Sequence, residues 1–278
     1  MKTRNLTFSL QLIFTLCVCA FLIVPVLMSA LAGITVNHFV GIKSGLTLRW
    51  IIEVWNGYGD TIFRSLGISV ACLVVTLLLG IPSAYVLARR SNRVTRALEE
   101  LLMLPIAVPG LATALALVSV YGSVGNFRSS WTFILVGHVL FTLPFMVRAV
   151  LAVMQALDLK TLEEGAASLG ANHWQRFVHV ILPNCRNGIV AGALMVLTLS
   201  IGEFNLTWLL HTPYTKTLPV GLADAYASMR LEIGSAYTLI FFVLIIPLLV
   251  ATQALAKPRP RKFVDNLPAD DGWVTAKQ

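Results

Sequence analysis

Residues 158–183, DLKTLEEGAASLGANHWQRFVHVILP, form the longest polar interruption in an otherwise apolar chain. They lie between two apolar runs that are each long enough to cross a membrane. Residues 161–169 are good helix formers, and Gly170 follows where a helix needs a left-handed terminating residue. Asn172 can cap a second helix, because Gln175 three positions later completes a capping box. Two short helices joined at a glycine predict a docking element.

The second of these helices has an apolar face. Trp174, Phe177, Val178 and Ile181 recur at the spacing of one side of a helix. Pro183 is predicted to end this helix, and it suits the first turn of the helix that follows. The apolar face could bind a groove in a partner protein or pack on the cytoplasmic base of neighbouring spans, and both interpretations remain open.

The same stretch carries a family pattern. The residues at the positions of this pattern are Glu164, Gly165, Ala166, Gly170, Val180, Leu182 and Pro183. This spacing resembles the EAA loop of permease subunits of binding-protein-dependent ABC importers. The family pattern reads E-A-A, three residues, G, nine residues, I, one residue, L-P. Here Gly165 replaces the first alanine and Val180 stands at the isoleucine position. The resemblance implies that Glu164, Gly165, Ala166, Gly170, Trp174, Phe177, Leu182 and Pro183 couple the chain to an ATPase.

The composition indicates an integral membrane protein. The 278 residues are 57% hydrophobic and only 12% charged, about half the charged fraction of a soluble domain. The net charge of +8 comes from short basic loops between apolar runs and not from a basic stripe with aromatic residues, so we expect no nucleic-acid partner. The four cysteines have neither CxxC spacing nor metal-ligand company, which predicts neither a disulfide nor a metal site.

The apolar runs predict an all-α protein with six membrane-spanning helices, which matches the type I importer permease fold that the resemblance implies. The predicted spans cover residues 6–32, 61–87, 100–121, 131–151, 188–210 and 235–255. The first run exceeds a signal-peptide core in length, so an uncleaved helix is favoured over a secretory signal. We divide the chain into a first helix with an external loop (1–60), a transmembrane domain (61–256) and a disordered, basic cytoplasmic tail (257–278).

Basic residues predict the orientation. With both termini in the cytoplasm, fifteen of the 21 Lys and Arg residues fall in or beside inner segments, and six fall outside. The positive-inside rule then places residues 158–183 in the cytoplasm. Together with the resemblance, this indicates a multi-pass protein of the bacterial inner membrane.

Within the second predicted span, small residues recur every three or four positions and indicate a helix-packing seam. They are Ser65, Ser69, Cys72, Thr76, Gly80 and Ser83.

Four residues are candidates for the translocation pathway. Pro109, four positions after Pro105, predicts a kinked or partly unwound third span. His138 lies alone within the fourth span, and although an intramembrane histidine is a functional candidate, a hydrogen bond to a neighbouring helix is the favoured interpretation. Glu203 and Asn205 lie in the fifth span, where a carboxylate should face a cavity, a partner subunit or a cation.

The sequence has no GxxxxGK[ST] loop and no hydrolase motif, so we expect no enzyme activity and no cofactor of its own. The resemblance implies a second permease subunit, two cytoplasmic ATPase subunits that bind ATP, and an extracytoplasmic substrate-binding protein. A secondary transporter would need more buried charge and internal repeats. A membrane-embedded enzyme would need polar residues that converge at one bilayer face.

Two features of the sequence bear on the substrate, and they disagree. Glu203 suits a cation such as a polyamine, whereas the run Gly202-Glu203-Phe204 resembles one found in sulfate and molybdate permeases. The general resemblance also includes permeases for phosphonates and ferric iron. The sequence therefore predicts a small charged solute but does not indicate whether its charge is positive or negative.

The predicted topology can be tested with alkaline phosphatase fusions, because this enzyme is active only outside the cytoplasm. Fusions after Asn126 and Ala225 should be active, and fusions after Arg93 and Gly170 should be inactive. An active fusion at Gly170 would contradict the cytoplasmic location of residues 158–183.

Overall fold

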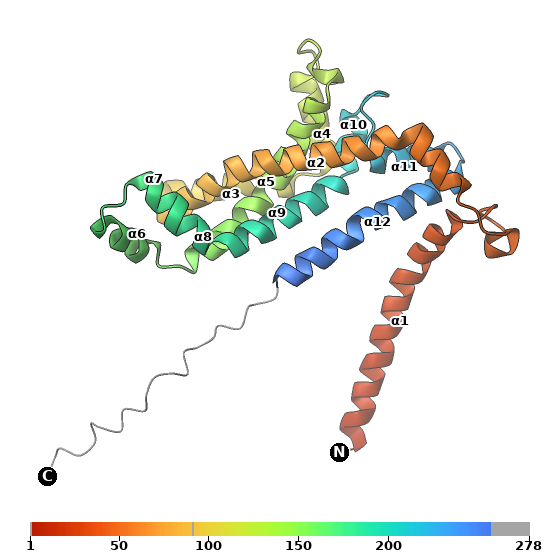
Figure 1. The fold of residues 1–278 in the computed structure, drawn as a ribbon, viewed down its shortest axis with the longest axis horizontal. Coiled ribbons are helices and arrows are strands. Elements are labelled where there is room, and N and C mark those ends of the chain that lie inside the picture. Colours follow the sequence, from red (N-terminus) through yellow and green to blue (C-terminus); the bar gives the residue numbers. More distant parts are fainter. Residues whose placement is uncertain (1, 91, 257–278) are drawn as a thin grey trace.

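The computed structural model describes residues 2–90 and 92–256, and the predicted tail lies outside them. In this part of the chain every regular element is helical, which confirms the all-α prediction (Figure 1). The elements are α1 (Lys2–Ala32), η1 (Gly41–Ser44), α2 (Arg49–Arg89), α3 (Arg93–Ala107), α4 (Gly110–Tyr121), η2 (Phe127–Ser129), α5 (Trp131–Gln155), α6 (Leu159–Ser168), α7 (His173–Gln175), η3 (Arg176–Ile181), α8 (Leu182–Asn184), α9 (Arg186–Ile201), α10 (Asn205–Leu210), α11 (Leu218–Ala227) and α12 (Leu231–Ala256).

The helices agree with the predicted number of spans. Helices α1, α2, α5 and α12 are each long and apolar enough to cross a bilayer. Two bent pairs, α3 with α4 and the segment His173–Asn184 with α9, bring the total among the described residues to six if each pair is one span.

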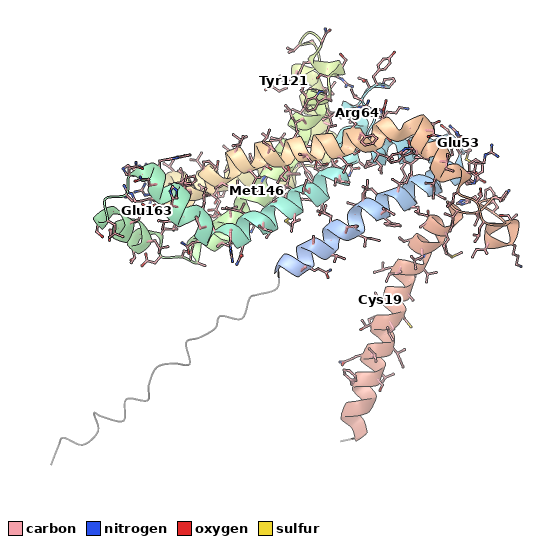
Figure 2. All side chains as sticks on the ribbon, in the orientation of Figure 1. Cys19, Glu53, Arg64, Tyr121, Met146 and Glu163 are labelled. Atoms are coloured by element: carbon pink, nitrogen blue, oxygen red, sulfur yellow. The ribbon has the colours of Figure 1, made fainter. Side chains whose placement is uncertain are left out.

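Helices α2, α5 and α9 form the centre of the bundle, around Met146 of α5 (Figure 2). A Cβ atom added to Gly80 of α2 would lie 2.7 Å from the Met146 side chain, and one added to Gly192 of α9 would lie 2.8 Å from its sulfur. Small residues allow this close approach, which matters in lipid because no hydrophobic force drives helices together there. The members of the predicted seam on α2 are buried from Ser65 to Gly80, and Ser83 is half-buried.

Three boundaries differ from the sequence-based prediction. Helix α2 begins at Arg49 and continues through residue 60, so the predicted boundary between loop and span has no break in the backbone. The third span is divided by a bend of 102° after Ala107, sharper than a kink, because Val108 takes the extended conformation favoured before Pro109. The fifth span is interrupted at residues 202–204, between α9 and α10.

Helix α1 lies apart from the bundle and approaches it only near its C-terminal end (Figure 1). There the Ser29 hydroxyl is 3.0 Å from the Tyr226 hydroxyl. A Cβ atom at Gly33 would lie 2.7 Å from the backbone of Ser235 and Ala236, so glycine is needed where the chain crosses α12.

Candidate functional site

The loop that opened the sequence analysis lies at one end of the bundle and begins with a capped helix (Figure 1). Asp158 precedes α6, and its carboxylate accepts hydrogen bonds from the Thr161 amide at 3.2 Å and the Thr161 hydroxyl at 2.6 Å. These hydrogen bonds lower the pKa of Asp158, so the capping charge is retained at neutral pH. The cap fixes where α6 starts, directly after α5.

Gly170 ends α6 as predicted. Its φ angle is +83°, and the amides of Gly170 and Ala171 donate to the carbonyls of Ala167 and Ala166. An added Cβ atom at Gly170 would contact nothing within 4 Å, so the backbone conformation and not the available space requires glycine there. At Gly165 a Cβ atom would also contact nothing, which explains why this chain and the family pattern can differ at that position.

The second helix begins with the predicted capping box. The Gln175 amide donates to Asn172 Oδ1 at 2.8 Å, and the Asn172 amide donates to Gln175 Oε1 at 2.9 Å. Its continuation, η3, is a π-helix, which changes the side-chain spacing. The residues of the predicted apolar face do not share one environment: Ile181 is buried in the core, while Trp174 is 70% exposed.

Phe177 lies between these two environments. Its ring contacts Tyr85 of α2 with centroids 5.2 Å apart, and Trp174 with centroids 6.1 Å apart. The inner part of the helix thus packs on the protein's own spans. Trp174 at the start of the helix, together with the 89% exposed Leu169 beside Gly170, presents apolar surface away from the bundle. Sequence reasoning missed Leu169, although an apolar residue next to a helix-ending glycine is a usable signal.

A buried carboxylate connects α6 to α2. Arg89 Nη2 is 3.0 Å from Glu163 Oε2, and the Tyr85 hydroxyl donates to Glu163 Oε1 at 2.5 Å. The sequence analysis selected Glu164, whose side chain is 68% exposed. Its Oε1 lies 3.9 Å from Lys160 Nζ, a long distance for an ion pair. It missed Glu163, which could have been found because it follows the buried Leu159 by four positions on the same helical face.

A cleft of about 830 Å³ separates α6 from the turn between α2 and α3. Its lining has mixed charge. Arg90, Arg96 and Lys160 contribute positive groups, and Glu99 and Asp158 contribute negative ones. A lining of mixed charge can accept a charged segment of another protein. Glu164 of α6 is one of the lining residues.

Leu182 and Pro183 join the loop to the fifth span. Pro183 lies in the first turn of the short helix α8, as predicted. The helical segment continues from His173 through Asn184, so the prediction that Pro183 ends the preceding helix was wrong. Proline is accepted there because the π-helix already alters the hydrogen-bond ladder. The helix axis instead bends by 72° at Cys185, before α9.

Glu203 lies in the interruption between α9 and α10, and not inside a continuous span as predicted. Its carboxylate accepts a hydrogen bond from the Leu206 amide at 2.7 Å. At the other end of α10, Arg128 donates to the carbonyls of Leu209 and Leu210. The buried Glu203 thus satisfies a backbone group that lipid could not satisfy.

The other pathway candidates occupy two different places. His138 is buried, with Nδ1 2.8 Å from the Ser200 hydroxyl and Nε2 2.8 Å from the Thr207 hydroxyl. Both ring nitrogens are therefore engaged within the bundle, away from any open surface. Pro109 and Asn205 are both exposed. They lie near each other, since a Cβ atom on Gly110, the residue after Pro109, would lie 3.3 Å from Asn205 Cβ. The two helix interruptions thus meet at one surface.

The sequence profile of the family described as "Binding-protein-dependent transport system inner membrane component" matches residues 77–261. The chain belongs to this family. The match includes the loop at 158–183 and every helix from α3 to α12, and it leaves out α1 and residues 49–76 of α2.

Individual permeases of the family resemble the chain over most of their length. A sulfate transport system permease protein, CysW of Synechocystis, is 29% identical over 216 residues, with 71% of this chain and 78% of CysW aligned. The molybdenum transport system permease protein ModB of Escherichia coli K12 is 27% identical over 192 residues, covering 64% and 83%. PhnV of Salmonella typhimurium, provisionally assigned to 2-aminoethylphosphonate transport, is 26% identical over 228 residues, covering 81% of each.

Membership confirms the predicted permease class, because the members of this family are transport permeases and not enzymes. It also implies an ATPase and a substrate-binding protein as partners of this inner membrane component. The pathway roles of Pro109, His138, Glu203 and Asn205 stay predictions.

Two glycines of the loop offer a matched test. Gly170→Ala should weaken ATPase binding about tenfold, because a side chain in a left-handed turn costs about 1–2 kcal/mol. Gly165→Ala should leave binding unchanged or tighter, because alanine is the better residue within a helix. Binding of purified ATPase to the permease in nanodiscs would be measured. Equal effects of the two changes would contradict a turn that requires glycine.

Proposed function

We propose that this permease forms half of the translocation pathway of an ATP-driven importer and receives the force for transport through residues 158–183. One observation carries the coupling role: Leu169 and Trp174 are exposed apolar side chains at the tip of a loop whose inner part is bound to the spans. Exposed apolar groups on a firmly held element are typical of a protein-docking surface.

The loop suits coupling because this chain lacks the means to hydrolyse ATP. Its sequence contains no phosphate-binding loop, so ATP is bound and hydrolysed by a partner. Two cytoplasmic ATPase subunits would each bind one permease loop, and a second permease subunit would complete the pathway. The meeting of the two helix interruptions near Pro109 and Asn205 favours that surface as the lining of the pathway.

The proposed orientation has both termini in the cytoplasm. It rests on the distribution of Lys and Arg. It is compatible with the contacts of α2, because the loop binds Arg89 at the end of this helix and residues 216–218 contact it 24 residues earlier, at Ser65. The outer end has a cleft of about 370 Å³ that includes Arg64, Lys216 and Asp224. We expect the extracytoplasmic binding protein to contact this end.

For the substrate we propose a small oxyanion or phosphonate. The relatives described above are named for sulfate, molybdenum and 2-aminoethylphosphonate. The main argument for a cation was the carboxylate of Glu203, and this group is already used to cap α10. A structural role for Glu203 removes the conflict between the two sequence features.

The docking role predicts the effect of shortening the loop tip. Trp174→Ala should weaken ATPase binding about thirtyfold, which corresponds to about 2 kcal/mol for a docked aromatic residue. Leu169→Ala should act in the same direction. Both side chains are exposed, so the permease should still insert and keep its thermal stability.

Tyr214→Ala is the matched control, because Tyr214 is also a strongly exposed aromatic residue and lies outside the loop. It should bind ATPase as the unmodified permease does. Unchanged ATPase affinity in both loop variants would rule out the tip as the docking surface.

A further inference from the structure

The two short helices of the loop meet on one face of α2. Tyr85 and Arg89 are four residues apart on this helix and therefore point the same way. The Tyr85 hydroxyl and the Arg89 guanidinium both bind the carboxylate of Glu163 on α6. The ring of Tyr85 also packs on Phe177 of η3. One side chain of α2 thus contacts both helices of the loop.

These contacts give the loop a second connection to the membrane part. The covalent connection through Leu182 and Pro183 leads into α9 across a π-helix and a 72° bend. Breaks of this kind are places where helices bend. The contact with α2 is different, because a buried carboxylate loses its compensating charge if the helices separate. The loop is therefore held more firmly to α2 than the chain connection alone would hold it.

Helix α2 also reaches the other side of the bundle. Its Ser65 hydroxyl accepts a hydrogen bond from the Leu218 amide at 2.7 Å, and Arg64 donates to the Lys216 carbonyl at 3.0 Å. Glu163 binds the last residue of α2, Arg89, whereas Arg64 lies 25 residues earlier on this helix (Figure 2). A displacement of α2 along or about its axis would therefore act directly on residues 216–218.

We propose that Glu163 is a positioning residue that binds the loop to α2, so that α2 carries the displacement of the loop to the external segment 216–218. This inference rests on the proposed coupling function. Glu163 contacts neither substrate nor ATP. It acts by keeping Tyr85 and Arg89 in register with α6 while the ATPase moves the loop.

Glu163→Ala tests the proposal in the assembled importer in nanodiscs, with its ATPase and substrate-loaded binding protein. ATPase affinity should change less than about twofold, because the exposed tip at Leu169 and Trp174 is untouched. Substrate transported per ATP should fall about tenfold, within the range of coupling energies between linked sites. A spin label on Tyr214→Cys, in a variant without native cysteines, should lose its ATP-dependent change in mobility.

Charge reversal separates the proposal from simple damage to the fold. Glu163→Arg and Arg89→Glu should each lower transport per ATP, and the double variant should recover at least about half of it because the ion pair is restored with opposite polarity. Glu100→Gln, which removes an exposed carboxylate from α3, should transport normally.

Three outcomes would overturn the proposal. They are normal transport per ATP in Glu163→Ala, equal loss of ATPase affinity and transport in that variant, and no recovery in the double variant. Failure of the proposed function is a separate result. It would appear as no ATPase binding by the unmodified permease, before any change at Glu163.

Discussion

Close contact between α2, α5 and α9 around Met146 is the constraint on which the rest of the bundle depends. Lipid offers helices no hydrophobic reason to associate, so their contact depends on small residues such as Gly80 and Gly192 and on the fit of the Met146 side chain between them. The loop at 158–183 is attached at one end of this unit through Ile181 and Glu163. A force on the loop therefore reaches a packed unit and not a single helix.

The same lipid environment explains the polar groups at the helix interruptions. Backbone groups released at a break have no water to bind, so side chains must satisfy them. Glu203 does so at the start of α10, and Arg128 does so at its end. A buried carboxylate in a transporter is readily interpreted as a substrate ligand, and that role stays a prediction for Glu203, while its Oε1 also accepts the Leu206 amide hydrogen bond. The surface at Pro109 and Asn205 is the better candidate for contact with a moving solute.

Local signals in the sequence predicted local features well. The glycine turn at Gly170 and the capping box of Asn172 and Gln175 depend on residues a few positions apart, and both were confirmed. Features that depend on distant partners were missed. The pairing of Glu163 with Arg89 joins residues 74 positions apart, and the π-helix η3 changes the spacing on which the predicted apolar face relied. No proline lies at residues 202–204 that would have predicted the helix break there.

The central claim is that the loop and α2 move together while ATP is used. Distances between spin labels at Ser168 of α6 and Leu78 of α2, both exposed, test it most directly in the assembled importer. The account predicts the same distance without nucleotide and with ATP bound, while the distance from Ser168 to Val243 of α12 changes. A change in the distance from Ser168 to Leu78 on ATP binding would contradict it.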